Sequence, residues 1–255
     1  MLPFFRKKRW RLAENPPAGR AGQFFKYSRY AIGEIVLVVV GILVALQINT
    51  WKQQADNRKE EQFYLIKLKD NFQQDTMNLN LRIGMLDSSR TGLMGVIKDL
   101  KAKKSDGFSD RNGITELLAT YSFYPEKSTF DNLTATGKLA LISNSMLVDS
   151  IHGYYNFVIN RSHSWNKAIE SYSRNIIAPY ILDKVPVFQK YSSEDLELLQ
   201  TGGASPMELS GDLELQNLLA FKINAIEEIQ QVYVRLNHQA LNVIKMIDEE
   251  IEDNK

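Results

Sequence analysis

The longest run without a polar side chain lies near the N-terminus, where residues 35–46 read IVLVVVGILVAL. Flanking apolar residues extend this run to about residues 31–51, and a helix needs roughly 20 such residues to cross the hydrocarbon of a bilayer. Tyr30 and Trp51 stand at its two ends, where aromatic rings favour the headgroup layer. The pattern predicts a transmembrane helix over residues 31–51.

Charge is distributed unevenly around this helix. Residues 1–30 contain one acid, Glu14, and eight basic side chains, whereas the residues that follow the helix mix both signs. The positive-inside rule therefore predicts a cytoplasmic N-terminal tail, residues 1–30, and an exported remainder. A buried helix of a soluble protein explains neither the aromatic ends nor the cations, and a cleavable signal peptide has a shorter basic region and a small-residue cleavage site. The basic residues are Arg6, Lys7, Lys8, Arg9, Arg11, Arg20, Lys26 and Arg29.

The predicted membrane helix carries one acid, Glu34, about one turn inside its cytoplasmic end. An ionised carboxylate at that depth is costly unless it is paired, protonated or able to reach water. At 100° per residue Glu34, Gly41 and Ala45 fall on one face, and the two small residues allow close approach of a second helix. Two interpretations remain open. Either the helix self-associates through this face, or Glu34 reaches back to Arg29 or Lys26 and the small residues have no role.

After residue 52 the apolar positions recur every three or four residues, which is the period of a helix, in three long segments. Turn-rich segments separate them, and no stretch alternates with the period of a strand. We therefore predict an all-α chain in which residues 52–255 form an elongated antiparallel helical bundle. The first stripe is Leu65, Leu68, Phe72, Leu79, Ile83, Leu86, Leu93, Ile97 and Leu100; the second is Leu147, Ile151, Tyr154, Val158, Trp165, Ile169, Tyr172 and Ile176; the third is Ile226, Ile229, Tyr233, Leu236, Ala240, Val243, Ile247 and Ile251.

Glycine and proline suggest where these helices bend or end. Gly84, Gly92 and Gly95 predict a kink in the first long helix. A short helix is expected over residues 114–121, and the second long helix should end at Pro179.

A second group of residues, between positions 128 and 155, forms a possible interaction patch. Ser128 is a favoured N-cap and Gly137 a favoured residue just beyond a helix C-terminus, so a two-turn helix is predicted between them. Tyr154 and Tyr155 are candidates to line a ligand groove, although aromatic residues at such spacing more often belong to a core. The patch comprises Ser128, Phe130, Asp131, Leu133, Gly137, Tyr154 and Tyr155.

The sequence contains no recognisable catalytic or cofactor-binding motif. It has no cysteine, which excludes disulfides, zinc–thiolate sites and a thiol nucleophile. It also lacks a phosphate-binding glycine loop, a zinc-binding histidine pair and a serine elbow, and His152, His163 and His238 are scattered. We therefore expect no enzyme activity, no cofactor, no metal and no nucleic-acid partner. An enzyme whose site is assembled from separate helices, for example with His152 near Asp131 or Arg161, remains the alternative.

Residues 30–49, YAIGEIVLVVVGILVALQIN, preceded by FFRK at residues 4–7, resemble the start of an uncharacterised family of single-pass envelope proteins of Gram-negative bacteria. STFDNL at residues 128–133, with GKL at 137–139 and Tyr154–Tyr155, is similar to the family's second recurring patch. The resemblance implies an inner-membrane protein with a cytoplasmic N-terminus and a periplasmic helical domain, and it implies no activity. The insertion-like NPPAGR before the membrane segment departs from the family.

The membrane segment also resembles that of biopolymer-transport and motor-accessory proteins, in which one span carries an acid near its start. Glu34 would then occupy the ion-carrying position, but the periplasmic part of those proteins is usually a small α/β or peptidoglycan-binding module. The leading hypothesis is therefore a membrane-anchored envelope scaffold or sensor-like interaction protein. Its expected partners are membrane lipid and either further copies of itself or other envelope proteins. An ion-coupled accessory subunit of a transport or motor complex is the alternative.

Overall fold

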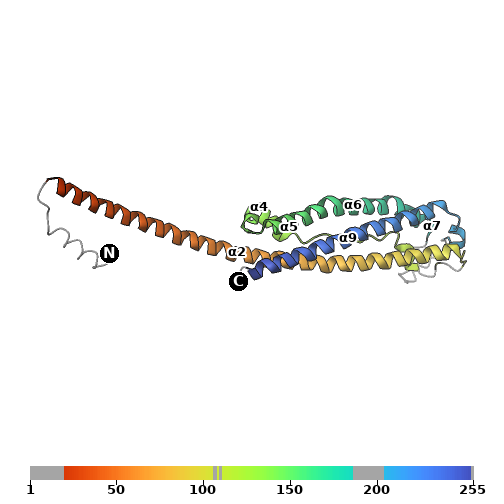
Figure 1. Ribbon diagram of the computed structural model, residues 1–255. Coiled ribbons are helices and arrows are strands. Elements are labelled where there is room, and N and C mark those ends of the chain that lie inside the picture. Colours follow the sequence, from red (N-terminus) through yellow and green to blue (C-terminus); the bar gives the residue numbers. More distant parts are fainter. Residues whose placement is uncertain (1–19, 106–107, 109–110, 186–203, 254–255) are drawn as a thin grey trace, which may run out of the picture. The chain divides into compact units, whose positions relative to one another are not determined.

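The computed structural model describes residues 20–105, 108, 111–185 and 204–253 (Figure 1). Within this part of the chain every regular element is helical and no strand occurs. The chain divides into two units, Met1–Lys59 and Glu60–Lys255. Residues 1–19 of the predicted cytoplasmic tail lie outside the described part. The elements are α2 (Arg20–Lys101), α3 (Arg111–Thr115), α4 (Ser128–Ala135), η1 (Lys138–Leu141), α5 (Ser145–Phe157), η2 (Val158–Ser162), α6 (His163–Tyr172), η3 (Ser173–Ile177), α7 (Ala178–Lys184), α8 (Pro206–Leu209) and α9 (Leu213–Asp253).

The first unit consists, in its described part, of the N-terminal portion of α2, where every residue from Ser28 to Lys59 is exposed. By length and composition this helix is long and apolar enough to cross a membrane, and none of its most apolar stretch is buried. A core helix of a soluble protein buries at least one side, so exposure on all sides sets this segment apart. The prediction of a single apolar helix of membrane-spanning length near the N-terminus is confirmed.

The core of the second unit is built on α9 and on the part of α2 that follows Glu60. Nearly all residues of the predicted first and third stripes are buried in this core, with Ile83, Ile97 and Ile251 only partly buried. Polar pairs also join the two helices, namely Lys69 with Asp248, Asn80 with Asn237, and Arg90 with Glu227. Because these partners come in opposite order along the chain, α2 and α9 run in opposite directions within this unit (Figure 1).

The second stripe is correct in its first half and only partly correct in its second. Leu147, Ile151, Tyr154 and Val158 are buried and Ile169 and Tyr172 pack partly buried against the core, but Trp165 and Ile176 are exposed. The cause is η2, a π turn, which inserts one extra residue into the helix and rotates everything beyond it. The residues that face the core after the turn are instead Ser162, Asn166, Ser173, Ile177, Tyr180 and Ile181.

The expected end of the second long helix at Pro179 is also wrong. The helix continues through Pro179 to Lys184, because a second π turn, η3, precedes the proline. In this turn the Ala178 N–H donates to the carbonyl of Ser173, five residues back. The wider turn carries the chain into α7 with the proline in its first turn, where a missing N–H is tolerated.

Helix α2 passes Gly84, Gly92 and Gly95 without interruption, so the glycines do not divide it. Gly92 has a packing role, because a Cβ atom at Gly113 of α3 would lie only 2.7 Å from the Gly92 carbonyl oxygen. The two backbones therefore touch. Helix α3 ends at Thr115, which corrects the expected helix over residues 114–121, and the chain then runs without regular structure across the core.

Helix α4 matches the predicted two-turn helix closely. Gly137 adopts a left-handed conformation with φ of 69° just beyond the C-cap residue Thr136, as predicted. The N-cap residue is Lys127 rather than Ser128, and no side chain caps this end. Ser128 is the first helical residue, and its N–H donates to the Glu126 carboxylate at 3.2 Å.

Candidate functional site

A buried carboxylate, Asp75, joins three segments of the second unit. It lies on α2 among the apolar residues of the first stripe and is fully buried. One of its oxygens accepts a hydrogen bond from the Tyr154 hydroxyl of α5 at 2.8 Å, and the other accepts from the backbone N–H of Glu126 at 2.7 Å. Both oxygens thus have a protein donor, and a single side chain fixes α5 and the segment before α4 against α2.

Aromatic rings enclose this carboxylate and keep water from it. Phe72, one turn before Asp75, packs edge-on against Tyr154 with ring centroids 5.0 Å apart. Tyr155 lies between Phe72 and Phe130 of α4, and the Phe130 ring stacks on it at 4.4 Å with the two planes 20° apart. Of the aromatic residues in the predicted patch, Tyr154 contacts Asp75 directly, Tyr155 packs against Tyr154, and Phe130 stacks on Tyr155.

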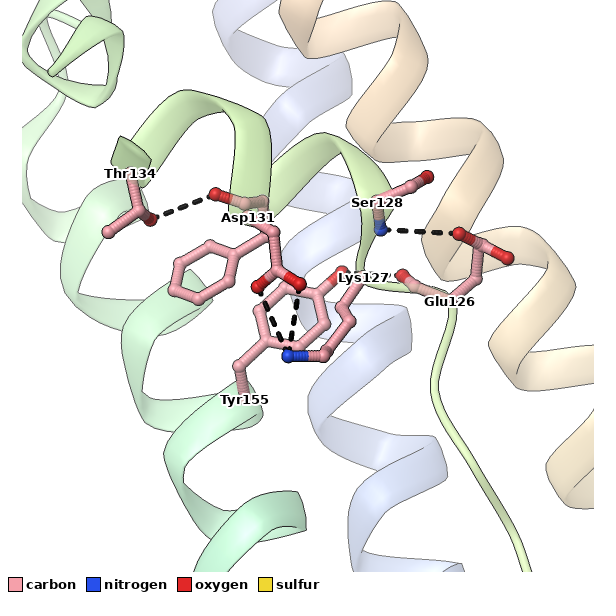
Figure 2. A network of polar contacts seen from close by, with 7 residues as sticks. Glu126, Lys127, Ser128, Asp131, Thr134 and Tyr155 are labelled. Carbon is pink, nitrogen blue, oxygen red and sulfur yellow. Dashed lines mark hydrogen bonds and ion pairs between the residues drawn. The ribbon is translucent and has the colours of Figure 1, made fainter. Parts of the chain in front are cut away.

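The segment that leads into α4 also contacts α5, and Figure 2 shows this segment, with Glu126 and Lys127, beside Tyr155 and Asp131. The Tyr155 hydroxyl donates to the Glu126 carbonyl at 3.0 Å, so Glu126 is bound through its carbonyl to Tyr155 and through its N–H to Asp75. On the exposed face, Lys127 forms an ion pair with Asp131 one helical turn later, at 3.0 Å. These contacts hold the backbone N–H of Glu126 in place for Asp75.

Burial changes the proton affinity of the site. It raises the pKa of Asp75 from 3.8 to about 6, because removal from water penalises the carboxylate more than its hydrogen bonds from Glu126 and Tyr154 stabilise it. Burial also raises the pKa values of Tyr154 and Tyr155, and the nearby Asp75 charge raises them further, so both hydroxyls remain protonated donors. On the exposed side, hydrogen bonds from Ser128 lower the pKa of Glu126.

The arrangement can hold or release one proton near pH 6 at Asp75. A perturbed carboxyl group of this kind occurs both at functional sites and in structural networks. In the described part of the chain no group of three or more His, Asp or Glu side chains is placed to hold a metal ion. The chemistry that the geometry supports is therefore proton-dependent stabilisation of the contact between α2, α5 and the segment before α4.

A second buried polar group lies farther along the same interface. The Tyr233 hydroxyl of α9 accepts from the backbone N–H of Phe123 at 2.9 Å and is within hydrogen-bond distance of the Tyr121 carbonyl and of Asn166 Oδ1. Asn166 is one of the polar residues that the first π turn rotates toward the core. The irregular segment between α3 and α4 is thus held on one side by Tyr233 and on the other by Asp75.

The structure divides the predicted patch into two groups. Phe130, Leu133, Tyr154 and Tyr155 are buried and therefore form core rather than an accessible surface. The remaining three, Ser128, Asp131 and Gly137, are exposed on and beside α4.

The other predicted site residues are separate from this region. Glu34, Gly41 and Ala45 lie exposed on α2 in the first unit. No hydrogen bond or ion pair joins His152 to Asp131 or Arg161 within the described residues, and the His152 ring instead packs edge-on against Phe130 at 5.3 Å.

The buried charged residues of the described part are Glu61, Asp75, Asp99 and Lys222, and the sequence analysis singled out none of them. The available signal was position: Asp75 follows Phe72 by three residues and precedes Leu79 by four, which places it on the apolar face of its helix. Lys222 precedes Ile226 by four residues, so it extends the third stripe backwards by one turn. A charged residue that continues an apolar stripe is a candidate for a buried functional or structural group.

Comparison with known proteins gives one match. A family model described as a family of unknown function, DUF6090, matches residues 34–175. This range is more than half of the chain, and it includes Asp75, Glu126, Tyr154 and Tyr155 but not α9. No curated protein and no solved structure is significantly similar to the chain.

Proposed function

We propose that this chain, which belongs to the DUF6090 family of proteins of unknown function, is a membrane-anchored interaction protein of the bacterial envelope. In this proposal α2 anchors it in the inner membrane, and the helical unit Glu60–Lys255 acts in the periplasm as a scaffold or sensor-like module. The observation that carries the proposal is that the apolar segment of α2 is exposed on every side.

The physical argument concerns what covers that segment. Side chains between Ile35 and Ile48 are about half exposed on every side of the helix, for example 58% at Leu37 and 58% at Leu43. Burying one Val, Leu or Ile side chain contributes about 1.5–3 kcal/mol, so leaving this whole run in water would cost more than the total stability of a typical domain, about 5–15 kcal/mol. A bilayer covers all sides of a single helix at once, and the helix satisfies its own backbone hydrogen bonds there.

The charges support an orientation with the N-terminus inside. Basic residues dominate the sequence before Tyr30, whereas both signs occur after Trp51. With that orientation the second unit lies in the periplasm, where we propose that it forms an elongated antiparallel helical bundle. The opposite directions of α2 and α9 support this arrangement.

The proposed mode of action is binding rather than catalysis. At the Asp75 site both carboxylate oxygens and both tyrosine hydroxyls are already bound to protein partners, so the network serves to hold segments together. Large apolar side chains are nevertheless exposed on the second unit, including Met77, Met146 and Leu213. We propose further copies of the chain or other envelope proteins as the partners, together with membrane lipid.

The membrane location of the protein and the orientation of its helix can be tested with single cysteines, because the natural chain has no cysteine. Ala13→Cys reports on the tail, and Ser164→Cys reports on an exposed position of α6. In spheroplasts we expect a membrane-impermeant maleimide to label Ser164→Cys at once and Ala13→Cys only after detergent is added. Labelling in the reverse order would contradict the orientation, and release of the protein by alkaline carbonate would contradict the anchor.

Self-association can be tested on the Glu34 face of the helix. Cross-linking in native membranes should fall in Gly41→Leu and Glu34→Ala and should persist in Glu34→Gln, because glutamine can still form an interhelical hydrogen bond, worth about 0.6–2 kcal/mol. Val39→Leu, on the opposite face, is the matched control. Unchanged cross-linking in all variants would mean that this face makes no contact. Normal assembly with loss of cellular function in Glu34→Gln would instead favour an ion-coupled role.

A further inference from the structure

A buried lysine near the start of α9 is paired only with neutral groups. The side chain of Lys222 is 2% exposed, and its ammonium donates to the Ala119 carbonyl at 2.6 Å and to the Ser173 hydroxyl at 3.3 Å. None of the ion pairs in the described part of the chain involves Lys222. An ammonium has three donors, so one N–H is left, and its charge has no ion-paired carboxylate. Buried charges are otherwise paired or neutralised.

Lys222 lines a cavity of about 20 Å³ between α2, α6, α9 and the segment before α4. Ser89 of α2 lines the same cavity, is 1% exposed, and its hydroxyl has no hydrogen-bond partner within the described residues. Most of the remaining wall is apolar, with Leu86 and Ile226 among its residues. About 10–15 Å³ of such space holds one water molecule, so this cavity has room for one water-sized or monatomic particle.

We propose that this cavity binds a single monatomic anion of the chloride class, held by the Lys222 ammonium and the Ser89 hydroxyl. The Ser89 hydroxyl has no partner within the described residues and Lys222 keeps one N–H to donate, and a buried donor without an acceptor is rare in folded proteins. A water molecule would satisfy the hydrogen bonds but would leave the ammonium charge with only the Glu116 carboxylate, which is not ion-paired to it, as compensation. A monovalent anion accepts both hydrogen bonds and neutralises the charge.

The protonation of Lys222 agrees with this assignment. Burial lowers its pKa to about 8, and the charge of Glu116, whose carboxylate accepts a hydrogen bond from Tyr121, acts in the opposite direction. At neutral pH the side chain is therefore still mainly the ammonium form that an anion requires. A bound anion favours the ammonium form, so it would raise the pKa of Lys222 from this lowered value.

The test uses the full-length chain in detergent, with chloride itself as the probe. Thermal unfolding is followed in sodium chloride and in sodium gluconate at equal ionic strength, since gluconate is too large for the cavity. A ligand that binds only the folded state should raise the midpoint by about 3–5 °C for each tenfold increase in chloride above its dissociation constant. The Lys222→Met variant, which keeps an apolar chain of similar length, should unfold at a midpoint independent of chloride, and Ser89→Ala should respond less than the natural chain.

The matched control is Lys167→Met, which removes an exposed lysine from α6 and should keep the full chloride response. A second measurement does not depend on variants: crystals grown in bromide should show an anomalous peak in the cavity. Equal midpoints in chloride and gluconate would overturn the proposal. So would a full chloride response in Lys222→Met, or a cavity without the bromide peak.

Discussion

Replacing Asp75 with asparagine removes the buried charge while it keeps the shape of the side chain. The asparagine oxygen can accept from the Glu126 N–H, and its amide can donate to the Tyr154 hydroxyl, which then acts as an acceptor. Both heavy-atom contacts of the natural carboxylate therefore have a replacement, but the Tyr154 O–H then loses its acceptor, which costs about 1–3 kcal/mol. We expect Asp75→Asn to fold and to be about as stable as the natural chain at pH 7.5.

The magnitude follows from the pKa of Asp75. Because its folded-state pKa of about 6 lies above the ordinary value of 3.8, the folded state holds a proton that the unfolded state releases between these values. The contribution of this group to stability is therefore greatest below about pH 4 and falls as the pH rises through 6, by about 3 kcal/mol in total. About 1–2 kcal/mol of this loss falls between pH 5 and pH 7.5.

The assay compares the two proteins across that interval, because other carboxyl groups also titrate and cancel in the difference. The thermal midpoint of Asp75→Asn, measured relative to the natural chain, should rise by about 2–6 °C between pH 5 and pH 7.5. Asp131→Asn is the matched control, since this exposed carboxylate should contribute less than about 1 kcal/mol at either pH. Parallel pH profiles for the natural chain and Asp75→Asn would refute the reasoning, because they would show that Asp75 keeps an ordinary pKa.

Four further substitutions, two that remove a hydrogen bond and two at glycines, are tested by urea unfolding of the full chain in detergent. Tyr154→Phe removes a donor from the buried carboxylate and should lower the free energy of unfolding by about 1.5–3 kcal/mol. Tyr155→Phe removes a hydrogen bond to a neutral carbonyl and should lower it by about 0.5–1.5 kcal/mol. Equal losses in the two variants would contradict a charged Asp75. Gly137→Ala places a side chain at a φ of 69° and should cost about 1–2 kcal/mol. Gly153→Ala, within α5 and with open space around it, should gain up to about 1 kcal/mol, and a loss there would contradict the helix assignment.

The helices α2 and α9 were predictable because their apolar residues keep the helical period without interruption. The prediction failed where the backbone departs from that period. The residues around Val158 do not indicate a π turn, because π turns have no characteristic amino-acid composition. One extra residue is nevertheless enough to move Trp165 to the surface and Asn166 into the core.

The polar site was only partly predictable, for a related reason. The resemblance to a known family marked Phe130, Tyr154 and Tyr155, but it carries no information on whether these rings face water. That depends on Asp75, which lies more than 50 residues away in sequence and is brought to them by the packing of α5 on α2. A single sequence shows which residues share a helix face, but not which faces meet.

Deleting Asn160 tests whether the π turn alone causes the shifted face. Asn160 is exposed within η2. Without it the segment can close as an ordinary α-helix, and the removed residue cancels the extra one. Ser162 and Asn166 then keep their present positions, so we expect the thermal midpoint to change by no more than about 1–2 °C.

The control is deletion of Asp149, an exposed residue of α5 that lies between the buried Leu147 and Ile151. This deletion rotates Leu147 by about 100° relative to Ile151 and Tyr154, because each helical residue turns the chain by that angle. The apolar stripe is then divided, and Tyr154 can no longer face Asp75 while Leu147 faces the core. We expect a much lower midpoint or loss of cooperative unfolding. Equal destabilisation by the two deletions would show that the extra residue is not confined to the π turn, and the exposure of Trp165 would then need another cause.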